Sequence, residues 1–112
     1  MGADAVVVYF GVQYVVPLGS KTEIDGLERG TDTRLLNAKK AGLQTWWGRI
    51  TDGQPYHLLI GRELGILGLE NDEQKEIGAP ALMKILEEIP KRLAAGGFKE
   101  TPGLHLLLEA QY

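Results

Sequence analysis

The first strong pattern in the chain is an apolar run over residues 5–16, in which Val, Tyr and Phe occupy most positions of both alternating sets. Successive side chains of a strand point to opposite faces of its sheet. A strand that is apolar on both faces is typical of a position with neighbours on either side and partial cover above and below. The run therefore predicts a central strand.

Residues 17–30 are rich in Pro, Gly, Ser and charged residues, and they leave two interpretations open, a helical turn or a functional loop. A short helix is predicted next, with Thr31 or Asp32 as its N-cap and Gly42 as its stop. Short polar side chains accept hydrogen bonds from the first helical amides, and Gly adopts the backbone conformation that ends many helices. We therefore expect one short docked helix after the first strand.

Two further strands are predicted over residues 43–51 and 56–63. The Asp-Gly pair at 52–53 lies between two runs rich in aromatic and β-branched residues, which is a strong hairpin signal. Beyond them, the glycines and acidic residues of 61–78 indicate a strand end followed by an exposed loop. The acidic residues, interpreted as part of a solvated loop, are Glu63, Glu70, Asp72, Glu73 and Glu76.

The longest helical pattern covers residues 79–96, where apolar residues recur at helical spacing. Pro80 lies in the first turn, where proline is tolerated. Pro90 removes a backbone hydrogen bond and clashes with the preceding turn, so we expect a kink or a break there. A last strand is predicted over residues 104–109, with Leu at alternating positions.

The order strand, helix, strand, strand, helix, strand is that of the ferredoxin-like βαββαβ arrangement. We therefore predict an α+β fold in which a four-stranded antiparallel sheet carries two helices on one face. The first and third strands are expected in its centre. The 112 residues suffice for one such domain, and nothing in the pattern indicates a second.

Strand alternation assigns the side chains to the two faces of this sheet. The helix-covered face is expected to receive Val6, Val8, Phe10, Val12, Trp47, Leu58, Ile60, Leu104, Leu106 and Leu108. The open face is expected to receive Val7, Tyr9, Gln13, Gln44, Trp46, His57, Leu59, His105, Leu107 and Glu109. Because the open face is still half apolar, we expect another subunit, a ligand or residues 17–30 to cover it.

Composition and charge narrow the function classes. The chain has no Cys, which excludes a disulfide framework, a thiol nucleophile and a Cys-ligated metal site. Its net charge is -3, so the chain lacks the surplus of basic residues that is typical of nucleic-acid binders. The apolar run at 5–16 is too short to cross a bilayer as a helix, and no basic residue precedes it. We therefore expect a cytoplasmic protein that binds neither nucleic acid nor membrane.

The two histidines are the main candidates for chemistry, because imidazole titrates near neutral pH and is a common metal ligand. With Glu109 as the one carboxylate expected nearby and no H-E-x-x-H motif, the pattern supports neither a metal site nor a cofactor. Hydrogen bonding across the sheet is the simpler interpretation of both imidazoles. Trp46 and Trp47 point to opposite faces, and Trp46 is the one expected to pack or to meet a ligand or partner.

Two functional hypotheses depend on the same open-face residues, namely Tyr9, Gln13, Trp46, His57, His105 and Glu109. The first is a non-enzymatic domain that uses this face for self-association as a homodimer or for binding a small ligand. The second is a small enzyme in which His57 or His105 is the general acid or base, Glu109 orients it, and the other three residues position the substrate. An RNA-binding sheet face is disfavoured by the acidic balance.

Overall fold

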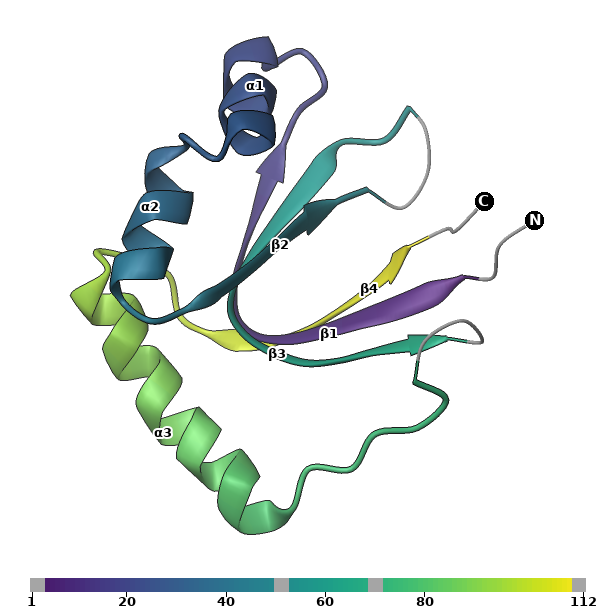
Figure 1. Cartoon of the computed structure of the whole chain (residues 1–112), viewed down its shortest axis with the longest axis vertical. Helices are drawn as coiled ribbons and strands as arrows, with labels where there is room; N and C mark the ends of the chain where they lie inside the picture. The colour runs from purple at the N-terminus through teal and green to yellow at the C-terminus, as the bar shows by residue number, and fades with distance from the viewer. Residues whose placement is uncertain (1–3, 50–52, 69–71, 110–112) are drawn as a thin grey trace.

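A computed structural model describes residues 4–49, 53–68 and 72–109 (Figure 1). Its one sheet is antiparallel and has the strand order β2-β3-β1-β4, so the first and third strands are central, as predicted. The strands are β1 (Ala5–Val16), β2 (Gln44–Gly48), β3 (Tyr56–Gly68) and β4 (Gly103–Glu109). The helices are α1 (Lys21–Arg29), α2 (Thr33–Lys40) and α3 (Ala79–Ala95). The arrangement is ferredoxin-like, with two short helices in the first connection.

The first connection resolves the alternative left open for residues 17–30, because its central part forms α1. This helix ends at Gly30, whose φ of 71° is left-handed. Asp32 then caps α2 as predicted, and its carboxylate accepts a hydrogen bond of 2.8 Å from the backbone N–H of Arg34. The predicted long helix forms α3, and it continues through Pro90 without a break.

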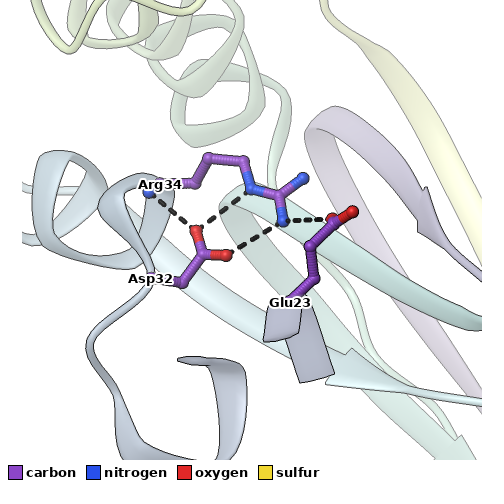
Figure 2. Close-up of polar contacts among 3 residues, drawn as sticks. All are labelled: Glu23, Asp32 and Arg34. Carbon is purple, nitrogen blue, oxygen red and sulfur yellow. Dashed lines mark hydrogen bonds and ion pairs between the residues drawn. The ribbon is translucent and has the colours of Figure 1, made fainter. Parts of the chain in front are cut away.

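An ion cluster joins the two short helices (Figure 2). The guanidinium of Arg34 donates to the Asp32 carboxylate at 3.0 and 3.1 Å and to Glu23 of α1 at 3.2 Å. The hydrogen bond from Arg34 holds the pKa of Asp32 below its usual value. The same guanidinium lies 5.2 Å from the centre of the Tyr14 ring, which connects this layer to β1. The ion cluster therefore joins α1 to α2, and the contact of Arg34 with the Tyr14 ring joins both helices to the sheet.

The third strand is longer than the sequence indicated. β3 continues to Gly68, through part of the segment predicted to be a loop, because a bulge lets it keep pairing with β1. The register shifts between Val8 and Tyr9, and Leu64 is the extra residue on β3. Asp52 of the predicted hairpin turn lies outside the described residues, whereas Gly53 has the positive φ of 85° that such a turn requires.

A row of glycines crosses the sheet where it bends. Gly11 pairs with Gly61 on one side and with Gly103 on the other. A Cβ on Gly11 would lie 2.0 Å from the carbonyl oxygen of Ile60, and one on Gly61 would lie 2.2 Å from that of Phe10. The central strands therefore approach each other too closely for any side chain, and at this row β1 and β3 turn sharply (Figure 1).

The bend divides the sheet into two halves that share β1 and β3. The β2 half consists of β2 with residues 56–60 and 12–16, and the β4 half consists of β4 with residues 62–68 and 5–10. The inner face, which carries Leu59 and Leu107, lies between the halves, and the outer face carries Leu58 and Leu106. The three helices lie outside the bend (Figure 1).

Each face has its own apolar cluster. On the outer side, the strands of the β2 half pack against residues such as Leu27, Ala38 and Leu93 from all three helices. The inner cluster comes from strands alone, with Trp46 and Ile66 beside four buried residues, namely Val7, Tyr9, Leu59 and Leu107. The sheet thus covers its own second face by folding over it.

The face on which each strand residue lies was predicted correctly, but which of these residues are buried was predicted wrongly in two places. The face expected to be open is buried at Val7, Tyr9, Leu59 and Leu107, where the most exposed residue is Leu107 at 7%. Conversely, three residues expected beneath the helices are exposed, namely Leu104 at 59%, Leu106 at 65% and Leu108 at 47%. The outer cluster includes no described residue of β4, because the helices cover the β2 half.

None of the helices in the described part of the chain is long and apolar enough to cross a membrane.

Candidate functional site

A chain of three polar side chains crosses the inner face. The Gln13 side chain contacts both histidines: its Nε2 lies 2.7 Å from His57 Nδ1, and its Oε1 lies 3.1 Å from His105 Nδ1. The other ring nitrogen of His105, Nε2, lies 3.0 Å from the carbonyl oxygen of Gly11. The residues come from β3, β1 and β4 in turn, and all three are half-buried.

Strand register places these residues together. His57 pairs with Val15, two residues from Gln13 on the same face of β1. His105 pairs with Tyr9, across the glycine row from Gln13. The long amide side chain of Gln13 therefore spans from a histidine of the β2 half to a histidine of the β4 half. We call this group the His-Gln-His chain.

The other predicted site residues lie around the His-Gln-His chain in different environments. Trp46 contacts the inner cluster, and its ring lies over Gly48, where a Cβ would come within 2.7 Å of it. Gly48 pairs with His57, so the indole extends towards that histidine. Tyr9 is 2% exposed, and burial, with the nearby Glu63 carboxylate, raises the pKa of its hydroxyl.

Glu109 lies apart from the histidines. It pairs with Ala5 at the far end of β4, four residues from His105, which corresponds to about 13 Å along a strand. The role of orienting an imidazole, given to Glu109 in the enzyme hypothesis, therefore falls to the Gln13 amide. Within the described residues, no group of three or more His, Asp and Glu side chains could hold a metal ion.

The outer face of the β4 half is a second candidate site, which sequence reasoning assigned to the core. Leu104, Leu106 and Leu108 form an exposed row along β4. Beside the row, a groove of about 290 Å³ separates the sheet from the start of α3. Its lining is almost entirely apolar, with one charged residue, and consists of Val8, Leu64, Gly65, Leu67, Lys75, Ile77, Leu82 and Leu104. Met83 and Leu86 of α3 are also exposed, at 62% and 44%.

The two edges of the sheet differ in their protection. β2 is short and lies against α2. β4 has seven residues, carries no Lys or Pro, and pairs with β1 without a bulge. Natural edge strands usually carry a Lys, a Pro, a bulge or an inward-pointing charge to prevent pairing with other chains, and the one charged residue of β4, Glu109, lies at its end. The alternating Leu row at 104, 106 and 108 was a usable signal for this site, but sequence alone did not show that helices leave it bare.

Comparison with known proteins adds no assignment to either site. No protein-family model, curated protein or solved structure matches the chain significantly.

Proposed function

We propose that this chain is a non-enzymatic, self-associating module whose two copies pair through the edges of β4 and bury the leucine row of the β4 half. The observation that carries the proposal is the exposure of Leu104, Leu106 and Leu108 on an edge strand that has no Lys, Pro or bulge. This keeps the homodimer expected from the sequence but moves its interface from the inner face, which the sheet covers itself, to the edge and outer face of β4.

The leucine spacing of β4 is self-complementary. In an antiparallel pair of β4 strands centred on Leu106, this residue faces its own copy, and Leu104 faces Leu108 of the second copy. Both outward rows then merge into one apolar surface across the twofold axis, as a closed symmetric dimer requires. The unpaired backbone N–H and C=O groups of the two edges also gain partners.

The polar residues of β4 are compatible with this pairing. On the inner face, His105 of one copy faces Leu107 of the other, and Gly103 faces Glu109. No like charges oppose each other directly, so the arrangement avoids the repulsion that destabilises cross-strand pairs. The apolar groove beside Leu104 continues this surface towards Leu82 of α3.

Sedimentation velocity over a range of protein concentrations tests the proposal with two charge substitutions. Leu106→Lys places an ammonium at the centre of the pairing, whereas the control Leu36→Lys changes a residue of α2 that is 48% exposed and lies beside the opposite edge. We expect a dimer for the wild type and for Leu36→Lys, and a monomer at all concentrations for Leu106→Lys, with unchanged circular dichroism. A wild-type monomer throughout, or a dimer that survives Leu106→Lys, would overturn the proposal.

A further inference from the structure

We infer that the His-Gln-His chain is a binding site for one proton, which the Gln13 amide places on one or the other histidine. The inference rests on which atoms can donate and which can accept, and it holds for either orientation of the amide. It is independent of self-association, because it concerns the inner face of a single copy.

In the orientation described above, the amide fixes the state of both rings. The Nε2 group of Gln13 can only donate, so His57 Nδ1 must accept and His57 must be neutral. Both nitrogens of His105 face carbonyl oxygens, one from Gln13 and one from Gly11. Carbonyl oxygens can only accept, so both His105 nitrogens donate, which requires the doubly protonated ring.

Rotating the amide by half a turn exchanges these roles. The Gln13 oxygen then faces His57 Nδ1, which must donate and can belong to a neutral or a doubly protonated ring. The Gln13 nitrogen donates to His105 Nδ1, and His105 donates to Gly11 through Nε2 as a neutral ring. With this orientation the chain is fully hydrogen-bonded with no added proton, or with one on His57.

A second proton breaks the pattern. If both rings are doubly protonated, both Nδ1 atoms must donate to Gln13, but the amide turns its single oxygen towards one of them. One hydrogen bond to a charged ring is then lost, and such bonds correspond to roughly a ten- to hundredfold difference in binding. The first proton is therefore bound with every hydrogen bond made, and the second is bound more weakly by this factor.

Few other charged groups face the His-Gln-His chain. Among the described residues of the surrounding strands, Tyr9 on β1, Glu63 on β3 and Glu109 on β4 are the titratable groups of the inner face. Arg49 follows β2, and its guanidinium lies 5.0 Å from the centre of the Tyr56 ring. The glutamine thus adds to the direct repulsion between the two charged rings in making the histidines exclude each other's charge.

Because the His-Gln-His chain spans the bend, its protonation has a structural consequence. His57 and Gln13 belong to the β2 half and His105 to the β4 half, so the hydrogen bond between Gln13 and His105 links the halves across the glycine row. A second proton removes a hydrogen bond on one side of Gln13. The His-Gln-His chain therefore spans the bend and makes all its hydrogen bonds with zero or one proton bound.

The test is an NMR titration of the imidazole nitrogens from about pH 8 to about pH 5, the range in which histidine changes charge. The protein has two histidines, so two rings account for the whole imidazole signal. In the wild type we expect one ring to become doubly protonated while the other stays neutral, with the second following at a proton concentration roughly ten- to a hundredfold higher. Double protonation of both rings over one pH interval would overturn the inference.

Two variants separate the amide from the rest of the site. Gln13→Glu supplies a carboxylate whose two oxygens both accept, so both rings are expected to become doubly protonated together. The control Gln74→Glu makes the same change at an exposed position and should titrate like the wild type. Gln13→Met removes the amide with little change in size and should bring the two titrations closer together, leaving the repulsion between the two rings. A wild-type titration in both Gln13 variants would contradict the proposed role of the amide.

Discussion

The two halves of the sheet are built from the same central strands, yet they are covered differently. In the β2 half, the outer face packs against helices and the inner face packs against the other half. In the β4 half, the inner face buries Tyr9 and Leu107, but the outer face exposes Leu104, Leu106 and Leu108. An alternating apolar pattern in a strand therefore indicates which side chains need to be buried. It does not indicate which part of the molecule buries them.

The difference follows from which part of the sheet the helices pack against. The second half of α3 buries Ile89 and Leu93 against the sheet, whereas Met83 and Leu86 in its first half are exposed. The first half of α3 therefore stands away from the sheet, and the groove beside Leu82 marks the gap between it and the β4 half. The bend buries the inner cluster between the two halves but does not cover the outer face of the β4 half.

The largest expected effect comes from removing the bend on which the comparison depends. Gly11→Ala places a methyl group against the backbone of β3, 2.0 Å from an oxygen, so we expect the free energy of unfolding to fall by about 4 kcal/mol or more. Gly19→Ala is the control, since nothing lies within 4 Å of its Cβ position. Urea denaturation measures both, and similar stabilities for the two variants would show that the glycine row does not shape the sheet.

A second prediction compares the inner and outer faces directly. Leu58 and Leu59 are neighbours on opposite faces, and both are fully buried. Truncation of either to Ala should lower the free energy of unfolding by about 3 kcal/mol, because each leaves a cavity in a packed cluster. Leu106→Ala should cost less than about 1 kcal/mol in dilute protein, where the exposed row has no partner. A small cost at Leu59 would mean that the inner face is open.

The smallest expected effect concerns the helices, which pack on the β2 half and leave the outer face of the β4 half exposed. Asp32→Ala removes both the N-cap of α2 and the contact with Arg34, and it should lower the free energy of unfolding by about 1 kcal/mol. Asp32→Asn keeps a capping side chain and loses the ion pair, so its cost should be about 0.5 kcal/mol. The exposed pair Arg29 and Asp25 provides a control, and Arg29→Ala should change the stability by less than about 0.5 kcal/mol.

The ionic part of the Asp32 contribution should depend on pH with a definite sign. Arg34 lowers the pKa of Asp32 in the folded protein below its usual value of 3.8. A carboxyl group with a lowered pKa stabilises the fold fully above its unfolded-state pKa, and this stabilisation disappears as the pH falls through the folded-state pKa. The difference between wild type and Asp32→Asn should therefore be constant near neutral pH and vanish in acid. Urea denaturation at several pH values measures it, and a difference that grows in acid would contradict the assignment.

Much of the candidate site could be predicted from the sequence, because strand alternation is a local property. It placed Gln13, His57 and His105 on one face, and the structure joins them by hydrogen bonds. The same alternation placed Glu109 on this face, although the four residues between it and His105 already correspond to about 13 Å along a strand. It could not show the bulge opposite Val8 and Tyr9, since a register shift depends on how two strands meet.

The sequence by itself determined the order of the strands and of the long helix, two candidate caps for α2 and the face on which each strand residue lies, because each depends on a few neighbouring residues and on fixed backbone periods. The tertiary structure decided which face is covered and by what. The glycine row allows the central strands to bend, and this bend buries Tyr9 and Leu59, while the helices pack on the β2 half and leave Leu106 exposed. Burial depends on contacts between distant segments, which no local pattern specifies.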